Sequence, residues 1–194
     1  MQVSRRAALA LGGSALLTSA ALTRPACAQQ GGMSAVTAYR YSFDALGGGQ
    51  IRLADFVDKP VLVVNTASFC GFANQFDTLE TVWKALSSRG LVVIGVPSND
   101  FGGQEPGGAA ETRQIATQHG VSFPLAAKTV VLGPNAHPFY KWAAALKPRD
   151  VPQWNFHKYL VGVDGRLAAV FPTSVEPNAP AVLSAIEREL VARS

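Results

Sequence analysis

Cys70 is the residue of this sequence whose surroundings most favour chemistry. It follows the β-branched run 61–65, which is typical of a buried strand, and precedes residues 72–86, where apolar side chains recur every three or four positions as in an amphipathic helix. A cysteine between a strand and a helix lies at the helix N-terminus, where the helix dipole and free backbone N–H groups stabilise a thiolate. Cys70 is therefore a candidate nucleophile, although a lone buried cysteine can also be inert.

A strand–cysteine–helix junction is the arrangement of thioredoxin-like proteins. Most redox proteins of that kind carry a second cysteine three positions later, where this sequence has Ala73. Disulfide exchange within such a pair is thereby excluded. The two cysteines and three histidines of the chain lack the spacing of a metal site, so neither a metal nor a cofactor is expected. A single thiolate can still attack a peroxide oxygen and become a sulfenic acid.

Peroxide chemistry at a thiolate needs hydrogen-bond donors for the sulfur and for the departing oxygen. Gln104 follows two glycines after the second predicted buried strand, and Trp154 and Asn155 come shortly before a predicted hairpin. Their amide and indole N–H groups donate without titrating. The residues alone leave two interpretations open: Trp154 as part of the core, with Gln104 and Asn155 as solvated loop residues, or all three as parts of one site.

The elements that must position these residues alternate between strands and helices. The sequence predicts hairpins over 39–56 and 159–171, strands over 61–65 and 91–96, and an extended segment over 125–132. It predicts helices over 72–86, which Gly90 stops, and over 111–119, 138–146 and 180–192. This order predicts a single α/β domain in which helices flank a central mixed β-sheet and a β-hairpin comes first.

The first 28 residues have the pattern of a secretory signal peptide. Arg5 and Arg6 precede an apolar stretch over 7–22, and the small residues 26–28 suit a cleavage site near Ala28. The paired arginines are similar to a twin-arginine export signal, and the general secretory route stays open. We therefore expect a signal peptide over 1–28, a flexible leader over 29–38, a domain over 39–194, and a periplasmic location. Cys27 would leave with the signal, because Arg24 disfavours a lipoprotein anchor.

Composition narrows the class of partner. The chain carries 17 basic and 13 acidic residues, for a formal net charge of +4. Three of the basic residues lie in the first 28, so the remainder has 14 basic residues against 13 acidic ones. No basic stripe remains that would bind a phosphate backbone, so we expect no nucleic-acid partner.

Three stretches resemble the signature blocks of the glutathione peroxidase family. They occur in the family's order and at about its spacing, and a fourth similar stretch covers residues 133–138. The three blocks are Val64–Phe72, Asn99–Gly107 and Trp154–Val161. The resemblance covers roughly residues 39–190. It implies a thioredoxin-like fold and hydroperoxide reduction at Cys70, which stands where some members have selenocysteine. It also implies that Gln104, Trp154 and Asn155 complete a tetrad around the sulfur.

The departures from the family pattern bear on how the enzyme is recycled. Many cysteine-type members carry a resolving cysteine in the segment that corresponds to residues 114–124, and this sequence has none there. The resemblance therefore implies a cysteine-type, bacterial-like member whose sulfenic acid is reduced by an external thiol, either glutathione or a thiol protein. The short segment before Trp154 resembles that of monomeric members, whose open site admits lipid hydroperoxides.

Two other functions compete with that of a thiol-dependent peroxidase. A peroxiredoxin carries Thr or Ser three residues before its cysteine, where this chain has Ala67. A non-enzymatic redox sensor that forms a mixed disulfide with a partner protein would contain the same residues. A sensor oxidises once and stops, whereas a peroxidase turns over when a reductant is supplied.

Overall fold

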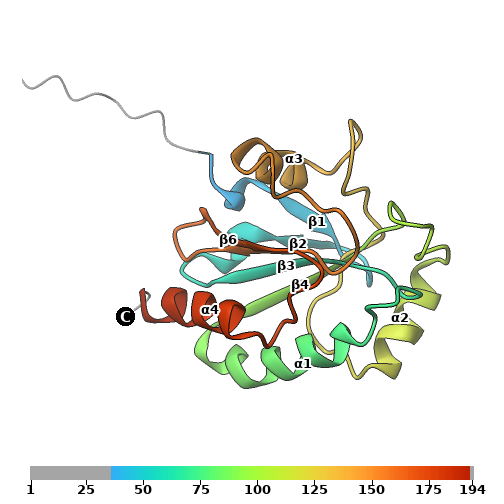
Figure 1. The fold of residues 1–194 in the computed structure, drawn as a ribbon, viewed down its shortest axis with the longest axis horizontal. Helices are drawn as coiled ribbons and strands as arrows, with labels where there is room; N and C mark the ends of the chain where they lie inside the picture. The colour runs from blue at the N-terminus through green and yellow to red at the C-terminus, as the bar shows by residue number, and fades with distance from the viewer. Residues whose placement is uncertain (1–35, 193–194) are drawn as a thin grey trace, which may run out of the picture. The chain divides into compact units, whose positions relative to one another are not determined.

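The computed structural model describes residues 36–192, so the expected signal peptide and residues 29–35 of the expected leader lie outside the described part (Figure 1). Within it the strands are β1 (Ser42–Asp44), β2 (Gln50–Arg52), β3 (Val61–Thr66), β4 (Val92–Pro97), β5 (Lys158–Val161) and β6 (Leu167–Phe171). The α-helices are α1 (Gln75–Leu86), α2 (Ala109–Gln118), α3 (Pro138–Leu146) and α4 (Pro180–Ala192). Short 3₁₀ helices are η1 (Ala38–Arg40), η2 (Leu53–Phe56) and η3 (Ser87–Arg89).

A four-stranded mixed sheet in the order β4-β3-β5-β6 forms the centre of the domain. β3 runs parallel to β4 and antiparallel to β5, and β5 is antiparallel to β6. Strands β1 and β2 form a separate antiparallel hairpin. The expected mixed sheet and N-terminal hairpin are therefore confirmed. The expected extended segment over 125–132 forms only isolated bridges, at Leu125 with Gly95 and at Ala126 with Ala45.

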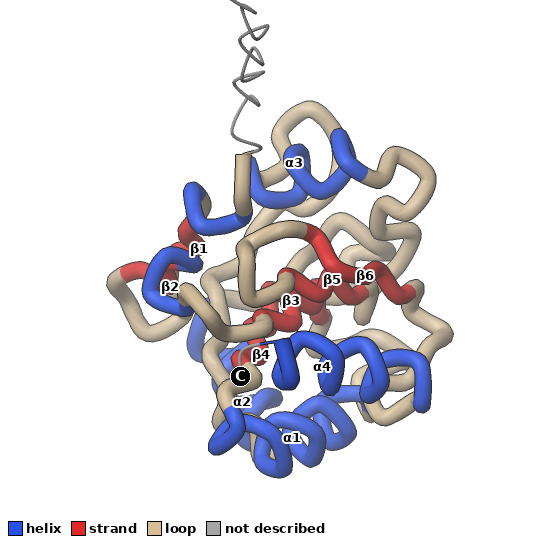
Figure 2. Tube along the Cα trace, turned by 90° about the vertical axis from the view of Figure 1, so that its left-hand side faces the viewer, coloured by secondary structure: helices blue, strands red, loops and turns tan. Residues whose placement is uncertain are grey.

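Side chains on the two faces of the sheet enter two separate hydrophobic clusters, because successive residues of a strand point to opposite faces. In β3, Val61 and Val63 join the cluster that contains the buried side of α3, and Leu62 and Val64 join the cluster that contains α1 and α4. Figures 1 and 2 show the same layers, with α3 on one side of the sheet and α1 and α4 on the other. Cys70 belongs to the α1–α4 cluster.

The topology brings three loops to one edge of the sheet. Parallel strands β3 and β4 end at the same edge, and the segment before antiparallel β5 begins there. The chain after β3 carries Cys70, the chain after β4 carries Gln104, and the chain before β5 carries Trp154 and Asn155. The fold therefore places every candidate site residue at the carboxyl edge of β3.

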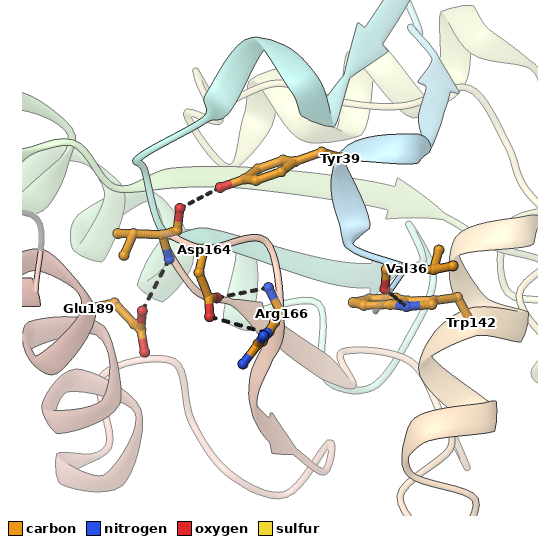
Figure 3. Close-up of polar contacts among 7 residues, drawn as sticks. Val36, Tyr39, Trp142, Asp164, Arg166 and Glu189 are labelled. Carbon is orange, nitrogen blue, oxygen red and sulfur yellow. Dashed lines mark hydrogen bonds and ion pairs between the residues drawn. The ribbon is translucent and has the colours of Figure 1, made fainter. Parts of the chain in front are cut away.

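The first described residues are anchored to the domain by side-chain contacts, which Figure 3 shows. The Trp142 indole N–H donates to the Val36 carbonyl at 2.8 Å, and the Tyr39 hydroxyl donates to the Val163 carbonyl at 2.5 Å (Figure 3). Gly165 has a φ of +75°, as the predicted tight turn requires, and a Cβ there would lie 2.5 Å from the Tyr39 ring. Residues 36–38 are thus packed into the domain, whereas we expected them in the leader.

Candidate active site

Cys70 ends a tight turn that follows β3. Its N–H donates to the Ala67 carbonyl at 3.4 Å, and its side chain is 6% exposed. The sulfur accepts a hydrogen bond from the Phe72 N–H at 3.5 Å. The neighbouring Phe69 and Phe72 are 53% and 39% exposed, so apolar aromatic surface flanks the thiol on both sides along the chain.

The expectation that Cys70 lies directly at the N-terminus of a helix is wrong. α1 begins at Gln75, and tight turns fill the gap, with the Ala73 N–H bonded to the Cys70 carbonyl and the Gln75 N–H to the Phe72 carbonyl, each at 2.9 Å. These bonds span three residues instead of four, so the α-helix has not yet begun. The effect of a helix dipole fades within the first turn of the helix, so α1 contributes little to stabilising a Cys70 thiolate. The hydrogen bond from the Phe72 N–H is the stabilising contact that the structure gives the sulfur.

Gln104 and Asn155 meet across the sheet edge. The Asn155 side chain, which is fully buried, donates from Nδ2 to Gln104 Oε1 at 3.4 Å. The backbone carbonyl of Gln104 accepts a hydrogen bond from the Phe69 N–H at 3.0 Å, and Phe69 is the residue before Cys70. The structure thus joins Gln104 both to Asn155 and to the turn that carries the thiol. Because Asn155 is fully buried, the interpretation of Asn155 as a solvated loop residue is wrong.

Trp154 lies against the glycine-rich loop that carries Gln104. Its ring centroid is 6.0 Å from that of Phe101, and a Cβ on Gly102 would be 3.3 Å from the indole. Gly102 also has a φ of +64°, which glycine adopts without strain, so this position suits the close approach. Trp154 is 37% exposed, which places it at the surface and not in the core.

Within residues 36–192, no hydrogen bond joins the Cys70 sulfur to the side chain of Gln104, Trp154 or Asn155; the bond from the Phe72 N–H is the one that the structure gives it. Hydrogen bonds of catalytic groups are often long in the absence of substrate and shorten when it binds. The four residues share one edge of the sheet.

Asn65 holds the Trp154–Asn155 segment and was not singled out from the sequence. It is fully buried at the end of β3, and its Nδ2 donates to the Trp154 carbonyl at 3.1 Å and to Asn155 Oδ1 at 3.2 Å. Its backbone carbonyl accepts the Phe156 N–H at 2.7 Å. Asn65 lies in the first signature block, so its place in that block was the signal that could have identified it.

Phe156 is held in a left-handed backbone conformation, with a φ of +69°. For a bulky residue that conformation costs about 1–3 kcal/mol and persists only where the surroundings enforce it. Its N–H is bonded to Asn65, its carbonyl accepts Lys158 Nζ at 2.7 Å, and its ring is fully buried. The strain lies directly after Asn155, so the contacts that enforce it also fix the direction in which Asn155 points.

Two buried basic side chains follow the strained residue. Burial lowers the pKa of Lys158 to about 8, and the negative charge of Glu176 offsets part of that effect. Burial and, to a smaller extent, the nearby Lys158 charge together lower the pKa of His157 to about 4. His157 is therefore neutral at pH 7, and Lys158 is the positive charge behind this part of the site.

The described residues limit what else the site can hold. Among residues 36–192 the structure has no group of three or more His, Cys, Asp or Glu side chains placed to bind a metal ion. None of the helices in that range is long and apolar enough to cross a membrane. Cys70 is the free cysteine of the described part. The chemistry available there is that of one thiol with amide and indole donors nearby.

A mixed sheet with helices on both faces and a cysteine after its central strand defines a thioredoxin-like protein. A thiol:disulfide interchange protein of the thioredoxin family from Chlorobium tepidum superposes with a TM-score of 0.58 at 15% identity, covering 77% of this chain and 92% of that chain, which supports the fold alone. The crystal structure of Trgpx in its apo form superposes with a TM-score of 0.67 at 31% identity, covering 81% of this chain and 97% of that chain.

Sequence comparison narrows this class to one family. The family model of glutathione peroxidase matches residues 38–144. A hydroperoxy fatty acid reductase of Synechocystis sp. is 40% identical over 153 residues, which cover 73% of this chain and 90% of the relative. The chain belongs to the glutathione peroxidase family, and it is a thiol-dependent peroxidase that reduces hydroperoxides.

Proposed function

We propose that Cys70 is the residue that reduces the hydroperoxide, and that Gln104, Trp154 and Asn155 assist it. The observation that carries the proposal is the backbone bond from Phe69 to Gln104, which joins the turn of the thiol to the loop of a tetrad residue. The bond between Asn155 and Gln104 brings in the third loop. These contacts support a role for the amide groups of Gln104 and Asn155 as donors near the sulfur.

The proposed reaction transfers two electrons from sulfur to the peroxide. The Cys70 thiolate attacks one peroxide oxygen, so that an S–O bond forms while the O–O bond breaks. The departing oxygen takes a proton and leaves as water or an alcohol, and Cys70 is left as a sulfenic acid. The N–H groups of Gln104, Trp154 and Asn155 would stabilise the charge that develops on the departing oxygen.

Regeneration by an external thiol completes the proposed cycle. A first thiol displaces water from the sulfenic acid and forms a mixed disulfide, and a second thiol releases Cys70 and a disulfide product. Cys70 is the cysteine that residues 36–192 contain, and Cys27 lies outside the described residues. Glutathione or the thiol of another protein would therefore supply the electrons.

The proposed substrates include lipid hydroperoxides as well as hydrogen peroxide. Phe69 and Phe72 expose apolar surface on both sides of Cys70, which suits an acyl chain. The Synechocystis relative is named a hydroperoxy fatty acid reductase, which supports the same class. The short connection from α3 to Trp154 supports a monomer, whose site stays open to bulky substrates.

Export to the periplasm is a separate proposal, which rests on the sequence of residues 1–28. Cleavage near Ala28 would remove Cys27 and leave Cys70 as the single cysteine of the mature chain. Mass spectrometry of the exported protein would find a mature chain that begins near Gln29, and light scattering would find a monomer. An intact Cys27 that carries a lipid would contradict the cleavage.

Replacing Cys70 with serine tests the assignment of the nucleophile. A Cys70→Ser protein should fold as the parent does, because the change is nearly isosteric, and should lose peroxidase activity, because a hydroxyl is barely ionised at neutral pH. Peroxide consumption is measured with glutathione and with a thioredoxin system as alternative reductants. Cys27→Ser is the matched control and should keep full activity. Turnover by Cys70→Ser would refute the proposal.

A further inference from the structure

Glu105, the residue after Gln104, is a buried carboxylate that contacts the turn of Cys70. Glu105 is only 1% exposed. Oε2 accepts the Ser68 N–H at 2.5 Å, and Oε1 accepts the Ser68 hydroxyl at 3.0 Å and also the Thr112 hydroxyl. Neutral groups therefore supply all three of these bonds. A carboxylate in a buried position needs such donors, because burial without them is costly.

The bonds from Ser68 and Phe69 fasten two consecutive backbone N–H groups to two consecutive residues of the opposite loop. Ser68 and Phe69 are the central residues of the turn that ends at Cys70, and they bond to Glu105 and to the Gln104 carbonyl. Any shift of one loop along the other would break both bonds together. The spacing between Cys70 and Gln104 is thus set by this pair of contacts.

Glu105 is itself held in place by its own loop and by neighbouring elements. Its N–H donates to Asn99 Oδ1 at 2.9 Å, and its carbonyl accepts Lys128 Nζ at 3.2 Å. Lys128 also bonds to the Gly107 carbonyl at 2.7 Å, and Thr112 belongs to α2. The carboxylate therefore contacts the turn from a base that is fixed at several points.

We infer that Glu105 is a positioning residue of the peroxidase, which sets the distance between the Cys70 sulfur and the Gln104 side chain through Ser68. This inference rests on the proposed roles of Cys70 and Gln104. Glu105 does not touch the sulfur in the structure and acts through the backbone of the turn. A misplaced reacting group slows a reaction even when every catalytic group is present.

Glu105→Gln tests the inference without a change of shape. An amide has one acceptor oxygen and a donor group in place of the second oxygen, so it cannot accept both the Ser68 N–H, which bonds to Oε2, and the hydroxyls of Ser68 and Thr112, which bond to Oε1. We expect the second-order rate constant for oxidation of Cys70 by peroxide to fall about tenfold. Alkylation of Cys70 by iodoacetamide, which needs no help from Gln104, should stay within about twofold of the parent rate.

A matched control comes from Glu80, which bonds to the N–H and hydroxyl of Ser122 away from the proposed site. Glu80→Gln should leave the peroxide rate constant within about twofold of the parent value. Thr112 lies on α2, and Thr112→Val removes its hydroxyl bond to Glu105. This variant should lower the peroxide rate constant about threefold, and it tests the inference even if Glu105→Gln folds poorly.

Either of two results would overturn the inference. One is a peroxide rate constant of Glu105→Gln within twofold of the parent. The other is an equal fall in peroxide oxidation and alkylation, which would show that the carboxylate acts on the reactivity of the thiol and not on its position. Loss of activity in Cys70→Ser alongside normal activity in Glu105→Gln would refute only the positioning role, whereas turnover by Cys70→Ser would refute the proposed function itself.

Discussion

Glu105 and Glu80 make the same pair of bonds to a serine in two different parts of the molecule. Glu105 receives the N–H and the hydroxyl of Ser68, and Glu80 receives the N–H of Ser122 at 2.8 Å and its hydroxyl at 2.5 Å. Both carboxylates are buried, since the two glutamates are 1% and 5% exposed. The local geometry alone therefore does not distinguish a contact that serves the site from one that serves the fold.

The surroundings separate the two contacts. Glu80 lies on α1 and forms an ion pair with Lys84, one helical turn later, at 3.0 Å, whereas the third donor to Glu105 is the hydroxyl of Thr112. Glu80 joins a helix to a loop, and Glu105 joins two loops that carry proposed site residues. The same bonds thus stabilise the fold in both places and bear on catalysis in one of them.

Removing each carboxylate should produce the largest effect. Glu105→Ala leaves the N–H and the hydroxyl of buried Ser68 without an acceptor, whereas the Thr112 hydroxyl keeps the Gly108 carbonyl at 3.3 Å. Glu80→Ala frees Ser122, which is exposed and can return to water. At about 2 kcal/mol for each buried orphaned donor, we expect the free energy of unfolding to fall by about 4 kcal/mol for Glu105→Ala and by about 1 kcal/mol for Glu80→Ala. Urea unfolding followed by circular dichroism measures both. Equal losses would mean that the neutral donors find other partners.

Acid should destabilise the region of His157, which adjoins the proposed site, at a higher pH than the region of Glu80. The pKa of His157 is about 4 in the folded protein and about 6.5 in the unfolded chain, so the unfolded chain binds more protons between those values. The free energy of unfolding is therefore full above pH 6.5 and falls by roughly 3 kcal/mol as the pH drops to 4. His157→Gln should remove this part of the decline, as measured by urea unfolding at each pH.

The Glu80 region should respond at lower pH. Burial raises the pKa of Glu80, but the bonds from Ser122 and the charge of Lys84 outweigh burial and lower it below its usual value. Its stabilising contribution is thus present above the ordinary pKa and is lost as the pH falls through the lowered one. Glu80→Gln should flatten only that lower range. Burial also lowers the pKa of His137. The free energy of unfolding of His157→Gln should therefore still decline somewhat over the upper pH range.

Truncating the two serines should give a smaller and more specific difference. Ser68→Ala and Ser122→Ala each remove one hydroxyl bond to a carboxylate and keep the backbone bond. Ser68 is buried and Ser122 is exposed, so the free energy of unfolding should fall by about 1–2 kcal/mol for Ser68→Ala and by about 0.5 kcal/mol for Ser122→Ala. Only Ser68→Ala should also lower kcat/KM for peroxide, by about threefold. A similar fall in kcat/KM for Ser122→Ala would show that loss of stability, and not position, controls the rate.

Replacing Lys84 should have the smallest effect. Its side chain is 64% exposed, so the ion pair with Glu80 is screened by solvent, and Lys84→Met should lower the free energy of unfolding by at most about 0.5 kcal/mol. Thermal unfolding in low and high salt would measure the difference. A loss above 1 kcal/mol would show that the contrast between the two glutamates depends on charge more than on location.

Local patterns were sufficient to predict most of the fold. The β-branched run of β3 and the Asp-Gly turn before β6 each have a conformation that follows from neighbouring residues, and both are found in the structure. The start of α1 was not predictable in this way, because Phe72 and Phe76 keep helical spacing whether or not the turns before Gln75 belong to the helix.

The proposed site was predicted only in part, because the residues that contact each other there lie far apart in the sequence. Gln104, Trp154 and Asn155 were identified from blocks that resemble a family, whereas the contacts that hold them span long stretches of chain. Ser68 and Glu105 are 37 residues apart, and Asn65 and Asn155 are 90 residues apart. In a sequence, Glu105 is one more charged loop residue, since burial and hydrogen bonding are decided by which loops meet in the folded chain.

The antiparallel pairing of β3 with β5 has a consequence for the order of folding. Val61 pairs with Val161, so closing this pair requires a loop of about 100 residues, and contacts of such separation form slowly. The bonds from Asn65, which lies in β3, to the Trp154–Asn155 segment extend that contact beyond the first residue of β5. A newly made or unfolded chain therefore carries its thiol without the proposed donors beside it, and recovery of peroxidase activity during refolding reports the closure of this strand pair.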